Sequence, residues 1–177
     1  MDWGQGRQRA LPLLPFDARA ACGSNDDLDA EVARLSRAAL SAAHDGASPL
    51  VHSAAGHDGA QVGAFRTALA ASGMAPDTAA RRIGEGLGRI LDGVLRGSDI
   101  RRAVISGGDT SGHAMRQLGL SALTALAPTI PGAALCLAYG DGPHDGLEIA
   151  LKGGQMGSPD YFGWIRDGGG PRAQEHS

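Results

Sequence analysis

The sequence is poor in aromatic residues and cysteine, and it contains no long apolar run. Aromatic side chains make up 4% of the 177 residues, which argues against the stacking platforms that bind single-stranded nucleic acid. The formal net charge of −3 lacks the basic excess of a nucleic-acid-binding domain. No stretch approaches the roughly 18 apolar residues of a membrane span. We therefore expect neither nucleic acid nor a membrane as a partner.

The two cysteines, Cys22 and Cys136, are isolated and lack the spacing of metal ligands. This pattern indicates reduced thiols in a cytoplasmic protein. Residues 7–22 superficially resemble a signal peptide, but Pro12, Pro15 and an aspartate interrupt the apolar part. We therefore expect a cytoplasmic location.

Lysine is almost absent, because Lys152 is the only lysine among the 16 basic residues. An arginine-rich background explains the other 15. A lysine retained against that background indicates a place for a compact, flexible point charge where a planar guanidinium would not fit.

Glycine, by contrast, is abundant, with 28 residues, and the length suits one domain. Alternating helical and β-type patterns predict an α/β fold, a layered sheet of mixed strands flanked by helices. We expect an irregular N-terminal arm over 1–23, an α/β domain over 24–166 and a disordered tail over 167–177. Helices are predicted at 24–43, 60–72, 76–97, 109–118 and 158–165, and strands at 50–53, 103–106, 121–126, 134–139 and 147–151. A loop rich in turn residues joins the last two strands, so we expect them to form a hairpin.

The segment 103–112, Ala-Val-Ile-Ser-Gly-Gly-Asp-Thr-Ser-Gly, reads as a strand, a tight turn and a helix start. Gly107 and Gly108 allow a ligand to approach the backbone, while Asp109, Thr110 and Ser111 are residue types that cap helices. The free amide groups of such a helix start bind phosphate or another anion. The alternative is a structural turn that binds nothing.

A second strand-glycine-helix junction lies at 152–157, Lys-Gly-Gly-Gln-Met-Gly. It combines a glycine turn with a cation, although a solvated lysine beside a plain turn is the alternative. Asp141, His144 and Asp145 stand in a loop typical of solvated turns, so we predict no metal site.

Four segments together resemble one family: 105–112, Leu118-Gly119-Leu120, Pro131-Gly132 and 150–157. The family is the C-terminal, nucleotide-binding domain of the four-carbon acid sugar kinases. Its members use ATP to phosphorylate threonate, erythronate and 3-oxo-tetronate type substrates. The resemblance covers roughly residues 11–163.

By position, the resemblance implies that ATP, with its Mg²⁺, contacts two places. One is the glycine turn at 107–108 with the helix start that follows it, and the other is a glycine of segment 152–157, which we call the closing motif. The site residues so implied are Gly107, Gly108, Asp109, Thr110 and Gly154, with Lys152 adding positive charge. Asp109 either caps the helix, which we favour, or orients a magnesium-bound water.

The sequence also departs from the family. Gly153, Gln155 and Met156 replace the usual serine, asparagine and phenylalanine of the closing motif. Neither the sugar-acid-binding domain nor the family's Gly-Ser-Cys-Ser segment is matched, so the fold is expected to be incomplete and the catalytic residues unknown. We expect a kinase domain that is inactive alone and needs a separate sugar-acid-binding domain in trans, with a homo-oligomer as a further option. The alternatives are a non-catalytic remnant and a self-contained enzyme acting through His113 or Lys152.

Overall fold

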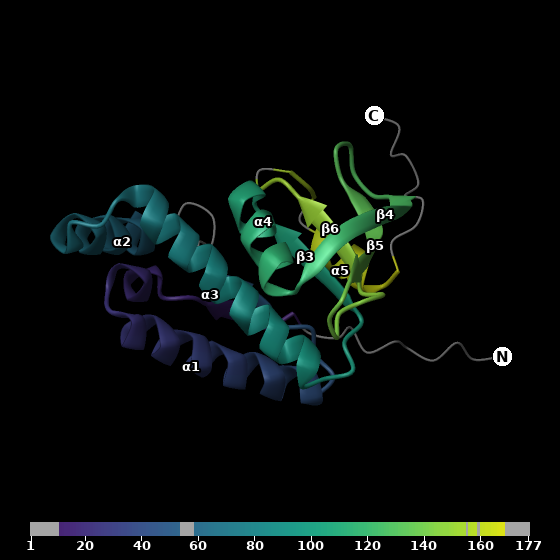
Figure 1. The fold of residues 1–177 in the computed structure, drawn as a ribbon, viewed down its shortest axis with the longest axis horizontal. Coiled ribbons are helices and arrows are strands. Elements are labelled where there is room, and N and C mark those ends of the chain that lie inside the picture. The colour runs from purple at the N-terminus through teal and green to yellow at the C-terminus, as the bar shows by residue number, and fades with distance from the viewer. Residues whose placement is uncertain (1–10, 54–58, 155, 159, 169–177) are drawn as a thin grey trace. The chain divides into compact units, whose positions relative to one another are not determined.

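The computed structural model describes residues 11–53, 59–154, 156–158 and 160–168, and it forms two compact units that meet in sequence between Asp99 and Ile100 (Figure 1). This boundary lies inside residues 24–166, which the sequence analysis predicts as one domain. The limits of that predicted domain stay a prediction. The predicted mixed α/β fold class is confirmed.

Two long helices, α1 (Asn25–His44) and α3 (Pro76–Arg96), form the framework of the first unit. Helix α1 begins in a capping box. The Asp27 amide donates a hydrogen bond to the Ser24 hydroxyl at 3.1 Å, and the Ser24 amide donates one to the Asp27 carboxylate at 2.8 Å. The Ser24 hydroxyl also donates to the Asp27 carboxylate at 2.7 Å, and this bond, together with the one from the Ser24 amide, lowers the pKa of Asp27. The two helices contact each other, and both contribute buried apolar residues, which are Leu28, Val32, Leu35 and Ala39 of α1 and Ile90, Val94 and Leu95 of α3.

Residues 11–23 are not irregular as predicted. They contain strand β1 (Leu13–Pro15) and a 3-10 helix η1 (Ala18–Cys22), and Phe16, Ala21 and Cys22 are buried. β1 pairs in parallel with β2 (Leu50–His52). Residues 1–10, the rest of the predicted arm, lie outside the described residues. Helix α2 (Gly59–Ser72) completes the unit and contacts η1.

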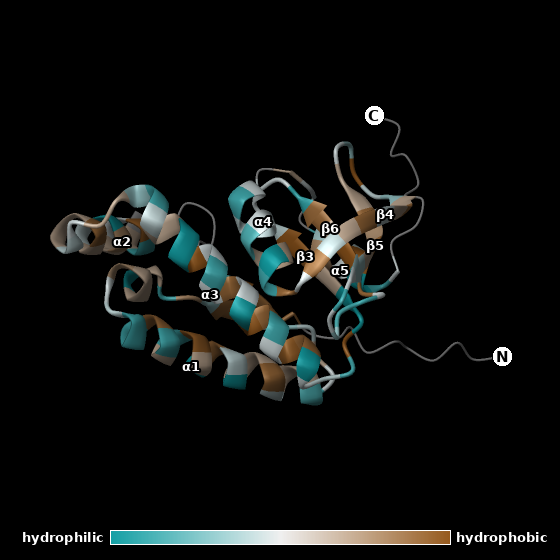
Figure 2. Ribbon diagram, in the orientation of Figure 1, coloured by the Kyte–Doolittle hydropathy of each residue, from teal (hydrophilic) through white to brown (hydrophobic). Residues whose placement is uncertain are grey.

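The second unit is a four-stranded mixed sheet in the order β3-β6-β5-β4. β3 (Arg102–Ser106) runs parallel to β6 (Glu148–Lys152). β5 (Ala134–Gly140) is antiparallel to both β6 and β4 (Leu120–Pro128), so the predicted pairing of β5 with β6 is confirmed. The hydrophobic residues of β3 and β6 are drawn brown in Figure 2.

Two helices pack on this sheet. α4 (Gly108–Gln117) contacts β3 and β4, and α5 (Tyr161–Arg166) contacts β3. Strands β5 and β6 share a core with α5. Its buried residues are Leu135, Ala150, Tyr161 and Ile165. The predicted disordered tail falls almost wholly on residues 169–177, which lie outside the described residues. Within the described chain, no helix combines the length and apolar character needed to cross a membrane.

Candidate functional site: two glycine corners

The first glycine corner lies where β3 turns into α4. Gly107 has φ +121° and ψ 134°, a backbone conformation that residues with a Cβ rarely adopt. A Cβ built on Gly107 would lie 3.3 Å from Thr110 Oγ1. A Cβ built on Gly108 would meet no atom within 4 Å, and Gly108 is exposed, so the space beside this residue is open.

The amide groups at the start of α4 are the donors of this corner. Within the described chain, the amides of Gly108, Asp109 and Thr110 have no acceptor, whereas the Ser111 amide bonds Gly107 O at 3.0 Å. The first amides of any helix lack a partner within that helix and carry its positive dipole end. This corner therefore presents three free donors to an anion.

The predicted cap at this helix is wrong. Gly107 is the N-cap residue and no side chain caps the helix, so Asp109, Thr110 and Ser111 all lie inside the first turn. The Ser111 hydroxyl donates to Gly107 O at 2.6 Å. The exposed Asp109 carboxylate makes no hydrogen bond with any residue that the structure describes, so this part of the chain gives it no structural role.

The second corner follows β6 and lies beside the first. The Gly107 amide donates to Lys152 O at 2.9 Å. A Cβ built on Gly154 would lie 4.0 Å from Gly107 Cα. The two corners meet because β3 and β6 are adjacent parallel strands, whose carboxyl ends share one edge of the sheet. The structure thus brings together residues 107–110 and Gly154, which the sequence separates by more than forty positions.

The Lys152 side chain is buried, with 8% of its surface exposed. Its ammonium donates to Met156 O at 2.7 Å and to Gly153 O at 3.2 Å, and it lies 5.8 Å from the ring centre of Tyr161 and 5.6 Å from that of Phe162. Burial lowers the pKa of Lys152. The cation therefore lies against the loop that follows β6 instead of extending into solvent.

Sequence reasoning missed the two rings that flank this cation. Tyr161 is buried and both rings belong to α5. The signal was the cluster of three aromatic residues at 161–164, in a chain with few others, only a few positions after the lone lysine.

The other candidate residues do not form a site in the described chain. His113 Nδ1 lies 2.7 Å from Arg116 Nη2 on the same helix. Across the described residues, no group of three or more histidine, cysteine, aspartate or glutamate side chains could hold a metal ion. His144 is buried in the loop considered above for metal.

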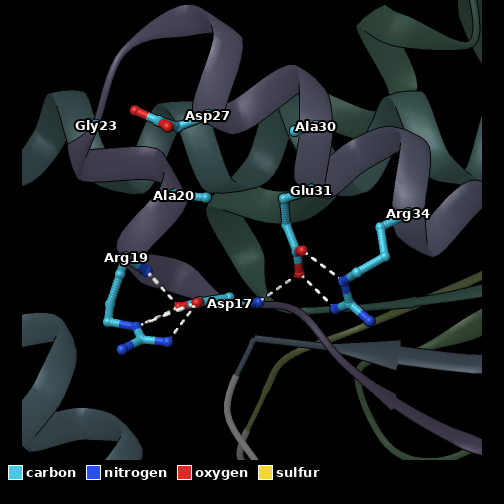
Figure 3. A pocket seen from close by; sticks show the side chains of 8 residues that line it. All are labelled: Asp17, Arg19, Ala20, Gly23, Asp27, Ala30, Glu31 and Arg34. Carbon is cyan, nitrogen blue, oxygen red and sulfur yellow. Dashed lines mark hydrogen bonds and ion pairs between the residues drawn. The ribbon is translucent and has the colours of Figure 1, made fainter.

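A hollow of about 490 Å³ opens in the first unit between η1 and α1 (Figure 3). Four of its charged side chains form ion pairs: Arg19 Nη2 lies 2.7 Å from Asp17 Oδ2, and Arg34 Nε lies 2.7 Å from Glu31 Oε2. The fifth, Asp27, accepts hydrogen bonds from Ser24. Glu31 Oε1 also accepts the Asp17 amide at 2.7 Å. This network ties the end of β1 to α1, so its charges are accounted for by the fold.

Solved structures share this fold. A Haemophilus influenzae protein superposes with a TM-score of 0.69 at 17% identity, over 92% of this chain and 35% of that one. A Bordetella bronchiseptica protein, crystallised as a domain-swapped dimer with bound citrate, gives a TM-score of 0.55 at 21% identity, over 89% of this chain and 34% of that one.

Curated relatives are sugar-acid kinases. A 3-oxo-isoapionate kinase of Paraburkholderia graminis is 41% identical over 166 residues, which are 93% of this chain and 35% of that protein. A 3-oxo-tetronate kinase of Methylobacterium radiotolerans is 39% identical over 105 residues, 59% of this chain and 23% of that protein. This chain therefore spans about a third of the length of the first relative and less of the second. The model of the nucleotide-binding C-terminal domain matches residues 4–162, and the chain belongs to that family, the C-terminal domain of the four-carbon acid sugar kinases.

Proposed function

We propose that this chain is the ATP-binding domain of a four-carbon acid sugar kinase, and that ATP binds at the two glycine corners. The enzyme so assembled would transfer a phosphoryl group from ATP to a tetronate-type sugar acid. The observation that carries the proposal is the placement of Gly107 and Gly154 side by side at the start of α4. The relatives that are sugar-acid kinases support the same activity.

The corner residues suit a polyphosphate. Phosphate oxygens would accept the free amides of Gly108, Asp109 and Thr110, where the helix dipole favours negative charge. The missing side chains of Gly108 and Gly154 leave room for the nucleotide to approach the backbone. Lys152 would add positive charge from behind the loop. Phosphoryl transfer relies mainly on such positioning and charge stabilisation.

Magnesium would arrive with the nucleotide. The described residues offer no cluster of ligands that would hold the ion by themselves, and Mg²⁺ at phosphate sites usually keeps several waters and few protein carboxylates. Asp109, exposed and without a partner in the described chain, is the residue that would orient one of those waters.

The sugar acid would be bound by a separate domain. These residues match 35% of the isoapionate kinase. We expect no sugar-acid phosphorylation by these residues alone, and activity once a sugar-acid-binding domain is present. A homo-oligomer is compatible with the domain-swapped Bordetella relative, and sedimentation velocity would determine the oligomeric state. We also propose a cytoplasmic location, where ATP is available.

Calorimetric titration with magnesium and ATP tests the nucleotide site. We expect binding by the wild-type chain and a loss of binding by Gly108→Val, because the valine would fill the open space at the first corner. Gly112→Ala is the matched control, since a Cβ there meets nothing closer than Arg116 Nη1 at 4.0 Å. Equal affinities in all three proteins would move the nucleotide away from this corner.

The second candidate function is a non-catalytic remnant that folds without binding nucleotide. It is favoured by the replacements at Gly153 and Met156 in the closing motif. A folded wild-type chain that binds no ATP at millimolar concentration would establish this candidate in place of the first.

A further inference from the structure

The loop that follows β6 contains four described residues, Gly153, Gly154, Met156 and Gly157, which we call the closing loop. Its backbone turns back on itself, because the Met156 amide donates to Gly153 O at 3.1 Å. Gly157 has φ +109°, and a Cβ there would lie 3.7 Å from Lys152 Cδ. The loop therefore folds over the stem of the lysine that precedes it.

We infer that Lys152 is a positioning residue for nucleotide binding: its ammonium fixes the closing loop by bonding two of its carbonyl oxygens, and so holds Gly154 against the first glycine corner. The inference rests on the proposed function, because it explains how the same site keeps its shape. It differs from a direct role, in which the lysine would contact phosphate through its charge.

The hydrogen bonds of the ammonium support this role. An ammonium has three donors, and two of them are used by Met156 O at 2.7 Å and Gly153 O at 3.2 Å. These two oxygens belong to opposite ends of the turn that contains Gly154. A single cation bonded to both ends therefore restricts the turn between them.

The main chain of the same residue connects the loop to the other corner. Lys152 O accepts the Gly107 amide at 2.9 Å, while the Lys152 side chain holds the closing loop. One residue is thus bonded to both corners, through its carbonyl on one side and its ammonium on the other. A change in its side chain would therefore reach the turn that contains Gly154 through the bonds of the ammonium to Gly153 O and Met156 O.

The surroundings of the ammonium explain why lysine is used. In the described chain no carboxylate pairs with Lys152, and its ammonium contacts neutral carbonyl oxygens and lies over the rings of Tyr161 and Phe162. Such rings attract a cation. The space suits a compact ammonium, whereas a guanidinium is larger, planar and built for two parallel hydrogen bonds. We therefore expect Lys152→Arg to fail as a replacement.

The test is amide hydrogen exchange measured by NMR on the nucleotide-free chain, combined with calorimetric titration of magnesium and ATP. Lys152→Met removes the charge and the donors but keeps a long apolar stem, and Arg116→Met removes an exposed charge elsewhere in the same unit. The exchange rate of the Met156 amide reports on the closing loop, and that of the Gly107 amide reports on its junction with the first corner. Neither residue is a sequence neighbour of a substituted position. Thermal unfolding verifies that each variant is folded.

We expect Lys152→Met to raise exchange at these two amides on the order of tenfold to a hundredfold, which corresponds to the loss of hydrogen bonds to a charged donor. It should also weaken ATP binding, whereas Arg116→Met should leave the exchange unchanged. Lys152→Arg should exchange fast and bind weakly despite its charge. If Lys152→Met does not fold, the same exchange measured on Phe162→Leu decides, because this variant removes one ring beside the ammonium and keeps the lysine.

Unchanged exchange in a folded Lys152→Met chain would overturn the inference, even if ATP binding fell, because the lysine would then act through charge alone. Wild-type affinity in Lys152→Arg with a fast-exchanging loop would overturn it as well. Failure of the wild-type chain to bind ATP would instead remove the proposed function, while the exchange rates would still show whether Lys152 fixes the loop.

Discussion

Adjacent glycines at the first corner should respond to the same substitution in opposite directions. Gly107 has φ +121° and ψ 134°, and alanine there would also place its Cβ 3.3 Å from Thr110 Oγ1. A residue with a side chain held in such a region costs about 1–3 kcal/mol. Gly108 has no left-handed φ and open space beside it, so alanine there should stabilise the fold by about 0.4–1 kcal/mol through the unfolded state.

Urea unfolding followed by tryptophan fluorescence measures both effects in the unit that contains the corner. Trp164 packs against the core below α5, and Trp3 is removed by the background substitution Trp3→Phe. The free energies of unfolding of Gly107→Ala and Gly108→Ala should then differ by roughly 1.4–4 kcal/mol, the sum of the two estimates. Two values within about 0.5 kcal/mol of each other would refute the assigned geometry of the corner.

Affinity for ATP separates stability from function in the same pair of variants. Under the proposed function, both alanines should weaken binding, on the order of tenfold or about 1.4 kcal/mol, although one chain is less stable and the other more stable than the wild type. Gly108→Ala is the more informative variant, because its loss of affinity cannot arise from a weakened fold. Wild-type affinity in Gly108→Ala would show that the open space at this corner is not where the nucleotide lies.

Three further changes test other parts of the structure. Gly140→Ala should destabilise the second unit by about 2–3 kcal/mol, because its Cβ would lie 2.2 Å from the carbonyl oxygen of the residue before β4. Thermal unfolding measures this effect, with Gly142→Ala as the control, since the Cβ at 142 would lie no closer than 3.9 Å to any neighbouring atom. Arg82→Met should lower the free energy of unfolding in urea by about 1–3 kcal/mol, since Arg82 donates to three carbonyl oxygens between η1 and the start of α1. The control Arg81→Met loses only an exposed ion pair within its own helix and should change that free energy by less than about 0.5 kcal/mol. Burial lowers the pKa of Lys152 below 10.5 in the folded chain, so the unfolded chain binds more protons between the folded and unfolded pKa values. The free energy of unfolding of the wild type should therefore rise with pH in that window relative to Lys152→Met. A difference between the two proteins that stays constant from about pH 7 to pH 10 in urea unfolding would contradict the shift.

The elements with strong periodicity could be predicted from the sequence. Helices α1 and α3 match their predicted ranges within a few residues, because a stripe of apolar residues on one face and clear end signals specify both. The strands β3, β5 and β6 likewise follow their short apolar runs. The pairing of β5 with β6 was also predictable, since a turn-rich loop joins them.

The N-terminal segment could not be predicted, because proline disfavours regular hydrogen-bonded structure. Pro12 and Pro15 are tolerated here since the short parallel pair uses other groups: Leu50 donates its amide to Pro12 O, and Phe16 donates its amide to His52 O. Neither proline needs the N–H that it lacks. Partners more than thirty residues away in sequence decide this strand, and no local pattern contains them.

The details of the site were also beyond the sequence. Asp109, Thr110 and Ser111 have the right residue types for a cap, but the left-handed turn at Gly107 starts the helix one residue before them. The sequence also could not show the Lys152 ammonium bonded to carbonyl oxygens of its own loop, because that requires the positions of Gly157 and α5.

The unusual closing motif is compatible with a nucleotide site because backbone groups hold the two corners together. One bond between them, from the Gly107 amide to Lys152 O, joins two backbone groups and does not depend on the side chains that follow β6. Gly154, the position that the resemblance implies for ATP, is still glycine, and a Cβ built on it would lie 4.0 Å from Gly107 Cα. The departures fall on its neighbours, and Met156 fills space against the turn between β4 and β5, where a Cβ on Gly132 would lie 3.2 Å from its Cε. A different side chain at 156 should therefore alter how the loop packs on that turn before it alters the donors at the start of α4.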